Sequence, residues 1–356
     1  MKVALITDLH FGIRNDNQNF IDYYYEFYNN VFFPTLKDRG INTVLNLGDT
    51  FDRRKFTNHN SLYHAKKMFY DPLKQNGIKL YQIIGNHDVY YKNTNEINVP
   101  ELSLGEYDNV SLIAKNATSI EIEGHKICFV PWINSENYQQ VFGELKKTDA
   151  LICCGHFEIE GFAMYRGAIS TEGLSQTTFR KFDMTFSGHY HYKSNSNGIY
   201  YLGNPYPLTW QDHGDERGFH ILDLETRELE FIRNPYEMFI KFIYDDVDKE
   251  FSDIVNHDLS KIKGKYVKIV VVAKTNPYAF DTFVNKVYEE NPADVSIVED
   301  ISDASDFTEE QLDQTQDTVT ILNNYVDNLQ DSSIEADKLK SFLREVYIEA
   351  LNITQD

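Results

Sequence analysis

The sequence has few cysteines and no long hydrophobic run. Only three of its 356 residues are cysteines. Cys153 and Cys154 are adjacent and Cys128 stands apart, so no CxxC spacing exists for zinc or redox chemistry. No stretch approaches the roughly 18 apolar residues of a transmembrane helix, and residues 3–6 are too short for a secretory signal. We therefore expect a soluble, cytoplasmic protein that has reduced cysteines and no membrane contact.

Positive charge is missing from one long stretch. The chain carries 55 Asp and Glu against 34 Lys and Arg, a formal net charge of −21, and residues 287–337 hold 15 acidic and no basic side chains. Because most of the excess charge is local, the composition excludes a broadly basic protein that coats DNA but allows a nucleic-acid substrate elsewhere on the chain. Hydrophobic residues make up 42%, and the length permits more than one core.

Residues 1–235 alternate short apolar runs with amphipathic stretches, the pattern of an α/β domain. Helices are predicted at 19–37 and 61–74, long enough to be right-handed crossovers between parallel strands. The predicted strands are 3–7, 43–47, 79–84, 127–130, 151–154, 184–186, 199–202 and 219–222.

After Asn234-Pro235 the pattern restarts. A strand at 265–273, a helix at 278–290 and a strand at 294–298 predict a small α/β capping domain over 236–298.

The C-terminal part divides into an acidic linker and a helical segment. Residues 299–317 contain eight acidic residues and no basic residue, which is typical of a solvated linker. Helices are predicted at 318–329 and 335–353, and the second has a wide apolar face. This hairpin could fold back on its own domain, but we favour docking of a partner on the face formed by Leu339, Phe342, Leu343, Val346 and Leu351.

Polar side chains able to bind metals follow five predicted strands directly. Because open α/β sheets bind ligands at the carboxyl ends of their strands, we expect one site there. Its members are Asp8 and His10, Asp49, Asn86 with His87 and Asp88, His156, and His189 with His191.

The spacing of these residues indicates two metal ions. A pair at i and i+2 in extended chain, such as Asp8 and His10 or His189 and His191, points to one side, so both side chains can meet one metal centre. Four histidines, two aspartates and one asparagine exceed the needs of one ion and suit two, bridged by a carboxylate. A mixed shell of imidazole and oxygen fits Mn, Fe or Zn better than Mg or Ca alone.

The motif series DxH, GDxxD, GNHD, GH and GHxH resembles the binuclear calcineurin-like metallophosphoesterases over residues 1–235. The chain length, Gly203-Asn204-Pro205, the small domain and the helical tail are similar to SbcD-type nuclease subunits of double-strand-break repair complexes, including those of T-even-type bacteriophages. This resemblance implies an α/β fold: a metallophosphoesterase β-sandwich flanked by helices, a small α/β capping domain and a C-terminal helical hairpin.

The resemblance also implies roles for the site residues. One metal would be held by Asp8, His10, Asp49 and His191, and a second by Asp49, Asn86, His156 and His189, with Asp49 as the bridge. Two divalent ions per chain are implied, with Mn preferred and Mg possible. His87 would be the catalytic residue that is not a ligand, and Asp88 would orient its ring.

The implied activity is that of a DNA exonuclease or endonuclease in recombination, repair and replication, hydrolysing phosphodiester bonds with water activated by two metals. The implied partners are double-stranded DNA at ends or single-strand junctions and an SbcC-type coiled-coil ATPase, with a homodimer inside a heterotetramer. A phage-encoded protein would act in the host cytoplasm. Arg53, Arg54 and Lys55 either hold the DNA backbone or are simply solvated.

Two other functions remain open. The metal motifs alone also suit a phosphomonoesterase or phosphodiesterase for small substrates, although such an enzyme needs neither a cap nor an apolar hairpin. A non-catalytic scaffold on the same fold is the alternative from another class. One departure concerns the GD motif: several relatives carry a second histidine just after it, where this chain has Asp52, which could orient a ligand.

Overall fold

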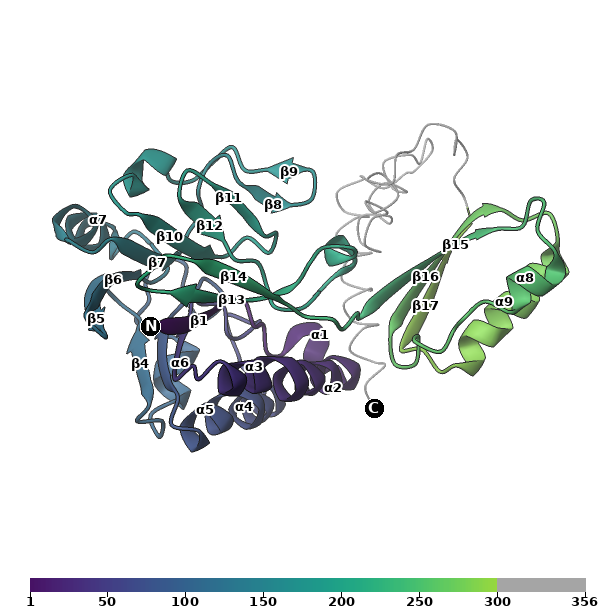
Figure 1. Ribbon diagram of the computed structural model, residues 1–356, viewed down its shortest axis with the longest axis horizontal. Coiled ribbons are helices and arrows are strands. Elements are labelled where there is room, and N and C mark those ends of the chain that lie inside the picture. The colour runs from purple at the N-terminus through teal and green to yellow at the C-terminus, as the bar shows by residue number, and fades with distance from the viewer. Residues whose placement is uncertain (300–356) are drawn as a thin grey trace, which may run out of the picture. The chain divides into compact units, whose positions relative to one another are not determined.

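The computed structural model describes residues 1–299 (Figure 1). Most of the predicted acidic linker and the whole predicted helical segment 318–356, with Leu339, Phe342, Leu343, Val346 and Leu351, lie outside the described residues. No helix within residues 1–299 is long and apolar enough to span a membrane.

The first of two six-stranded sheets contains the N-terminal strand. Its order is β14-β13-β1-β2-β3-β4, and β1 to β4 run parallel while β13 and β14 are antiparallel additions. The predicted parallel arrangement of β1, β2 and β3, with helices in the connections, is therefore confirmed. The strands are β1 (Lys2–Ile6), β2 (Thr43–Asn46), β3 (Lys79–Ile83), β4 (Val110–Ile113), β13 (Gly218–Asp223) and β14 (Leu229–Arg233).

The second sheet has the order β11-β12-β10-β7-β6-β5, with a parallel centre and antiparallel edges. Its strands are β5 (Thr118–Ile122), β6 (His125–Val130), β7 (Ile152–His156), β10 (Met184–Gly188), β11 (Ser194–Ser196) and β12 (Ile199–Tyr201). One face of each sheet contributes to a shared core, in which Leu5 and Leu45 meet Phe129 and Phe186. The expected β-sandwich is therefore confirmed.

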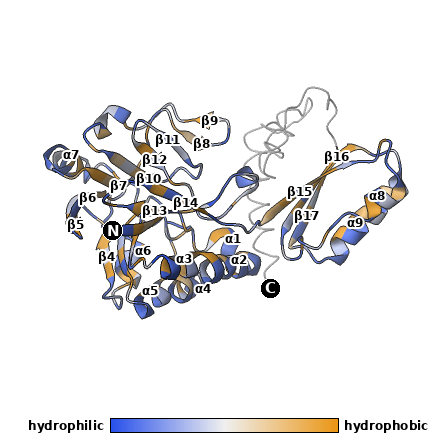
Figure 2. Ribbon diagram, in the orientation of Figure 1, coloured by the Kyte–Doolittle hydropathy of each residue, from blue (hydrophilic) through white to orange (hydrophobic). Residues whose placement is uncertain are grey.

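Helices cover the outer faces of both sheets (Figure 1). The first sheet is covered by α2 (Gln18–Phe27), α3 (Phe33–Asp38), α4 (His59–Ala65) and α5 (Asp71–Gln75), and the second by α7 (Tyr138–Lys147). In Figure 2 the strands are mainly hydrophobic, whereas the covering helices mix hydrophobic and hydrophilic residues, as expected of elements with one buried face.

Each of the two predicted crossover helices is interrupted by a π-helical turn, at Tyr28–Phe32 and at Lys66–Tyr70. The N–H of Phe33 bonds the carbonyl of Tyr28, five residues back, one position before Pro34. The second turn likewise ends just before Pro72. A proline has no N–H, and its ring clashes with the carbonyl four residues earlier in a regular α-helix. The wider π-helical turn accommodates the proline, so the helix continues.

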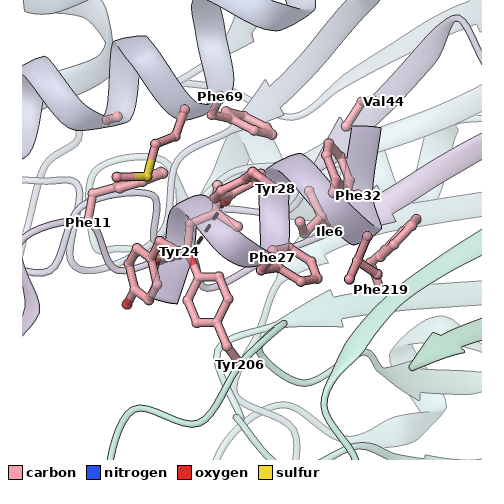
Figure 3. Close-up of a cluster of buried hydrophobic side chains, with 14 of the residues drawn as sticks. Ile6, Phe11, Tyr24, Phe27, Tyr28, Phe32, Val44, Phe69, Tyr206 and Phe219 are labelled. Atoms are coloured by element: carbon pink, nitrogen blue, oxygen red, sulfur yellow. Dashed lines mark hydrogen bonds between the residues drawn. The ribbon is translucent and has the colours of Figure 1, made fainter. Parts of the chain in front are cut away.

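Aromatic side chains fill the space between these helices and the first sheet (Figure 3). Tyr24 stacks on Tyr206 with ring centroids 4.0 Å apart, and Phe27 and Phe32 meet Phe219 edge to face. The Tyr206 hydroxyl donates to the carbonyl of Leu9 at 2.7 Å. The aromatic core thus fixes the loop that directly follows β1.

Residues 236–298 contain a parallel three-stranded sheet, β15-β16-β17, with its own core against α9. Its elements are β15 (Phe239–Asp245), α8 (Phe251–Val255), β16 (Tyr266–Ala273), α9 (Pro277–Glu289) and β17 (Asp294–Val298). The two predicted strands and the helix are confirmed, whereas β15 and α8 were not predicted. The domain boundary at residue 235 stays a prediction.

The remaining elements are short and lie in the connections between strands. They are α1 (Ile13–Asp16), α6 (Val99–Ser103), the hairpin of β8 (Ala163–Tyr165) and β9 (Ala168–Ile169), and 3-10 turns at Gln176–Phe179 and Trp210–Asp212.

We expect Phe27→Ala to lower the free energy of unfolding by about 3 to 5 kcal/mol, because it empties a fully buried aromatic position. Urea denaturation followed by circular dichroism measures this change. Tyr63→Ala removes an aromatic ring that is 56% exposed and should change stability by no more than about 0.5 kcal/mol. Equal losses in both variants would contradict the central place of the aromatic core.

Candidate metal centre

The structure brings all seven predicted metal ligands together at the carboxyl ends of β1, β2, β3, β7 and β10. The first three strands are neighbours in one sheet, and the last two are neighbours in the other. Because the strands are parallel within each sheet, their ends share one edge of the sandwich. The side chains form two groups that meet at one carboxylate.

The first ligand group consists of Asp8, His10 and His191, whose candidate ligand atoms lie within 4.8 Å of one another. The Nε2 atoms of His10 and His191 are 3.1 Å apart, and Nε2 of His191 is 4.0 Å from Oδ1 of Asp8. Oδ2 of Asp49 lies 4.0 Å from Nε2 of His10. One imidazole pair and two carboxylates therefore face the same small volume.

The second ligand group consists of Asn86, His156 and His189 together with Asp49. Oδ1 of Asn86 is 3.1 Å from Nε2 of His156 and 2.8 Å from Nδ1 of His189. Oδ2 of Asp49 is 3.2 Å from Nε2 of His156. The same carboxylate oxygen thus faces both groups, which is the position a bridging ligand needs.

The backbone at the site is bent into the left-handed region at four non-glycine residues. Asp8, His10, Asp49 and His189 have φ values of 54°, 46°, 49° and 87°. Each such residue costs of the order of 1 to 3 kcal/mol and persists only where the surroundings hold it. Here the N–H of Asp8 donates to the carbonyl of Gly48 at 3.0 Å, and that of His10 donates to the carbonyl of Asp49 at 3.1 Å.

Gly85 leaves the space that Asp49 occupies. A Cβ at this position would lie 2.1 Å from Oδ1 of Asp49, so any other residue would displace the shared carboxylate. The glycine of the GNHD motif is therefore required by close approach.

Three of the four histidines are held by a partner on the ring nitrogen that faces away from their ligand group. Nδ1 of His10 is 3.2 Å from Oδ1 of Asp52, and Nδ1 of His156 is 2.7 Å from the carbonyl of Leu47. Nε2 of His189 is 3.1 Å from Oε1 of Glu158. Such outer partners fix the orientation and tautomer of a metal-binding histidine.

Asp52 lies against the predicted ligand His10, where it could orient the ring, whereas Glu158 was missed in the sequence. The only local signal for Glu158 is its place two residues after His156. Its target, His189, is 31 residues further along the chain.

The electrostatics of the site fit cations. Burial opposes ionisation of Asp49, yet the adjacent His156 holds the pKa of this carboxyl well below its usual range. Burial likewise disfavours the charged forms of His10 and His156, but neighbouring carboxylates raise the pKa of each imidazole to about 9. Together, these carboxylates and imidazoles form a set of oxygen and nitrogen donors that suits divalent ions.

His87 lies beside the two groups. Its N–H donates to Oδ1 of Asp49 at 2.8 Å, and its ring Nδ1 is 2.5 Å from the carbonyl of Asp52. The ring meets that of His10 edge to face, with centroids 5.0 Å apart. Ligand atoms of His10, Asp52 and His87 also lie within 4.8 Å of one another. His87 is therefore held next to the predicted metals by the loop that contains Asp52.

Asp88 has different partners from the one expected. Its Oδ1 accepts from the N–H groups of Thr50 and Phe51, at 3.0 and 3.1 Å, and its Oδ2 from the N–H of Gly85 at 2.9 Å. The prediction that Asp88 orients the ring of His87 is corrected, since the Asp52 carbonyl occupies that place. Asp88 ties the loop after β2 to the loop after β3.

The basic run Arg53, Arg54 and Lys55 begins directly after Asp52. The guanidinium of Arg53 lies 4.9 Å from the ring centroid of Phe56, and Lys55 is exposed. The run therefore starts at the site, and contact with DNA stays a prediction.

Residues 1–193 match the calcineurin-like phosphoesterase family. The chain is a calcineurin-like phosphoesterase. This confirms the resemblance seen in the motifs, and members of the family hydrolyse phosphoesters with divalent metals.

Two relatives are informative about this phosphoesterase. It is 28% identical over 352 residues to exonuclease subunit 1 of Enterobacteria phage T4, covering 98% of this chain and 99% of the relative. It is 25% identical over 233 residues to the SbcD subunit of the nuclease SbcCD of Staphylococcus epidermidis, covering 58% of this chain and 60% of the relative. The similarity to the phage protein thus extends through the small sheet domain and the C-terminal segment.

We expect Asp52→Asn to weaken Mn²⁺ binding by roughly 10- to 100-fold, because it removes the charge that faces Nδ1 of His10. Isothermal titration calorimetry on metal-free protein measures the affinity. Glu225→Gln is the matched control: it removes a carboxylate 3.4 Å from His125, which lies at the start of β6 and outside both ligand groups, and should leave Mn²⁺ affinity unchanged. Unchanged affinity in Asp52→Asn would show that the contact does not support metal binding.

Proposed function

We propose that this phosphoesterase is the nuclease subunit of an SbcCD-type DNA recombination and repair complex, which hydrolyses phosphodiester bonds in DNA. The observation that carries the proposal is the pair of ligand groups sharing the carboxylate of Asp49, 3.2 Å from His156 and 4.0 Å from His10. The near full-length similarity to a phage exonuclease subunit supports DNA as the substrate.

In this proposal the first ion is held by Asp8, His10, Asp49 and His191, and the second by Asp49, Asn86, His156 and His189. Their four imidazoles favour Mn²⁺ over Mg²⁺, although Mg²⁺ remains a possible occupant. Two ions bound by these residues would supply activation of a water molecule and stabilisation of the charge that develops on the phosphate during in-line displacement.

His87 is the proposed catalytic acid. With its Nδ1–H donated to the Asp52 carbonyl, a second proton at Nε2 makes the ring cationic. The ring can then stabilise the scissile phosphate or give that proton to the leaving oxygen. Asp49 positions the same residue by accepting its backbone N–H. No side-chain nucleophile is required, so no covalent intermediate is expected.

The proposed substrate contact is the basic run of Arg53, Arg54 and Lys55. A phosphate backbone lying along this loop would be next to the ligand groups, because Asp52 at its start touches both His10 and His87. Three cations can neutralise only a few phosphates of the DNA backbone. The affinity of the isolated chain for DNA should therefore be weak and sensitive to salt.

We further propose that the chain works with a partner. Residues 1–235 would be the nuclease domain, 236–298 a cap that contacts DNA, and 318–356 the docking segment for an SbcC-type coiled-coil ATPase. The second relative is by name a subunit of such a nuclease. A homodimer of this chain within a heterotetramer, acting in the cytoplasm of the host cell, completes the proposal.

We expect His87→Ala to reduce cleavage of linear duplex DNA by roughly 10²- to 10⁴-fold with Mn²⁺ present, because proton transfer is lost while the ligands remain. Gel assays with DNA, parallel assays with bis-p-nitrophenyl phosphate, and calorimetric Mn²⁺ binding provide the measurements. His59→Ala replaces an exposed histidine on α4 and should cleave like the unsubstituted chain. Wild-type cleavage by His87→Ala would overturn the role assigned to this residue.

The same assays separate the alternative functions. Turnover of the small diester without DNA cleavage, even with the ATPase added, would favour a small-substrate phosphodiesterase. Two bound Mn²⁺ ions per chain with no turnover of either substrate would favour a scaffold.

Truncation after Asp313 should leave hydrolysis of bis-p-nitrophenyl phosphate unchanged but end association with the ATPase, because it removes the proposed docking segment. Co-purification of the two chains on an affinity tag measures association. The matched control is the full-length chain with Leu151→Ala, which replaces an exposed apolar residue of the nuclease domain. Retained co-purification of the truncated chain would contradict the docking role.

A further inference from the structure

His191 differs from the other three histidines of the metal centre. Their second ring nitrogens meet Asp52, the Leu47 carbonyl and Glu158, whereas among residues 1–299 the Nδ1 of His191 has no hydrogen-bond partner. The side chain of His191 is also 32% exposed, against 3% for His10 and none for His156. Something other than the ring must therefore fix this ligand.

The backbone of His191 is held by a buried arginine. Nη1 of Arg217 donates to the carbonyl of His191 and to Oδ1 of Asn204. Gly203 lies close to the same carbonyl, since a Cβ there would be 2.8 Å from its oxygen. The His191 carbonyl therefore contacts both the Arg217 guanidinium and the turn at Gly203-Asn204.

Arg217 is itself fixed in place. Its Nη2 lies 2.8 Å from Oδ1 of Asp212 and 2.9 Å from Oδ2 of Asp215, and the side chain is only 5% exposed. One terminal nitrogen of the planar guanidinium donates to two carboxylates, and the other donates to a peptide carbonyl and a side-chain amide oxygen. The single ammonium group of a lysine cannot reproduce this arrangement.

The second oxygen of Asp212 accepts the N–H groups of Leu208 and Thr209 at 2.7 and 3.0 Å. This contact ties the arginine, which ends the loop between β12 and β13, to residues 208 and 209 near the middle of the same loop. A shift in that loop would therefore move the guanidinium, and with it the peptide of His191.

We propose that Arg217 is the positioning residue for His191, directing the ligand into the first ligand group through its peptide carbonyl. The inference rests on the proposed two-metal function. The side chain is more than two residues away in sequence from every predicted ligand, and its hydrogen bond to the centre goes to the backbone of His191. Its loss should therefore affect the first ion and spare the second.

Mn²⁺ binding to Arg217→Lys and Arg217→Met tests the proposal, with calorimetry for affinity and electron paramagnetic resonance for the coupling of the two ions. We expect one site to weaken by roughly 10- to 100-fold while the other is unchanged, so that a coupled pair is replaced by a single isolated ion at moderate Mn²⁺. His191→Ala should give the same spectrum, and Arg39→Met, which breaks an exposed pair with Glu230, should not.

Loss of the Arg217 cation leaves the buried carboxylate of Asp212 unpaired, whereas Asp215 keeps Arg166 at 2.5 Å, and an unpaired buried charge can prevent folding. Gly203→Ala is the second variant, because it presses on the His191 carbonyl and, at a φ of 70°, strains the turn beside it without changing charge; it should likewise weaken only one site. Circular dichroism and urea denaturation identify which variants are folded, and the comparison of sites uses only those.

Equal weakening of both sites in the folded variants, or unchanged affinity at both, would overturn the inference. A third result concerns the proposed function instead: if the unsubstituted chain binds fewer than two Mn²⁺ ions, the two-metal centre fails irrespective of Arg217. The two failures are therefore distinguished by the unsubstituted protein alone.

Discussion

The carboxylate of Asp49 is the point on which the whole site depends. Oδ2 faces His10 on one side and His156 on the other, and Oδ1 accepts the N–H of His87. One side chain thus connects the first ligand group, the second ligand group and the proposed acid. Gly85 gives it room, because a side chain there would occupy the position of the carboxylate.

The sandwich makes this arrangement possible. Neighbouring parallel strands end at the same edge, so short loops from both sheets reach one place, where left-handed backbone turns the ligands inward at a cost in free energy. The buried Tyr206 hydroxyl holds that geometry by bonding the carbonyl of Leu9, which lies between the predicted ligands Asp8 and His10. Carboxylates and carbonyls fix three of the histidine rings, whereas Arg217 holds His191 through its main chain. The precision of the site is therefore a property of the folded sandwich.

The sequence alone determined the main strands of the sandwich, the order of the motifs and the seven residues that the fold brings together. These features are local: each strand is a short apolar run, and each ligand pair or single ligand follows one. The π-helical turns were not predicted, because the hydrophobic pattern of a helix does not reveal one extra residue in a single turn. Strand β15 was not predicted because it is an edge strand and only partly buried.

Tertiary structure alone decided which residues support the ligands. Sequence proximity suggested Asp88 as the partner of the adjacent His87, but the Asp52 carbonyl takes that place, and Asp88 binds backbone amides. Glu158 and Arg217 act on histidines 31 and 26 residues away, respectively. The end of a strand determines the position of the residue that follows it, and the sequence reveals this position. The hydrogen-bond partners of that residue depend on which loops from other strands lie beside it. That arrangement exists only once the two sheets have packed.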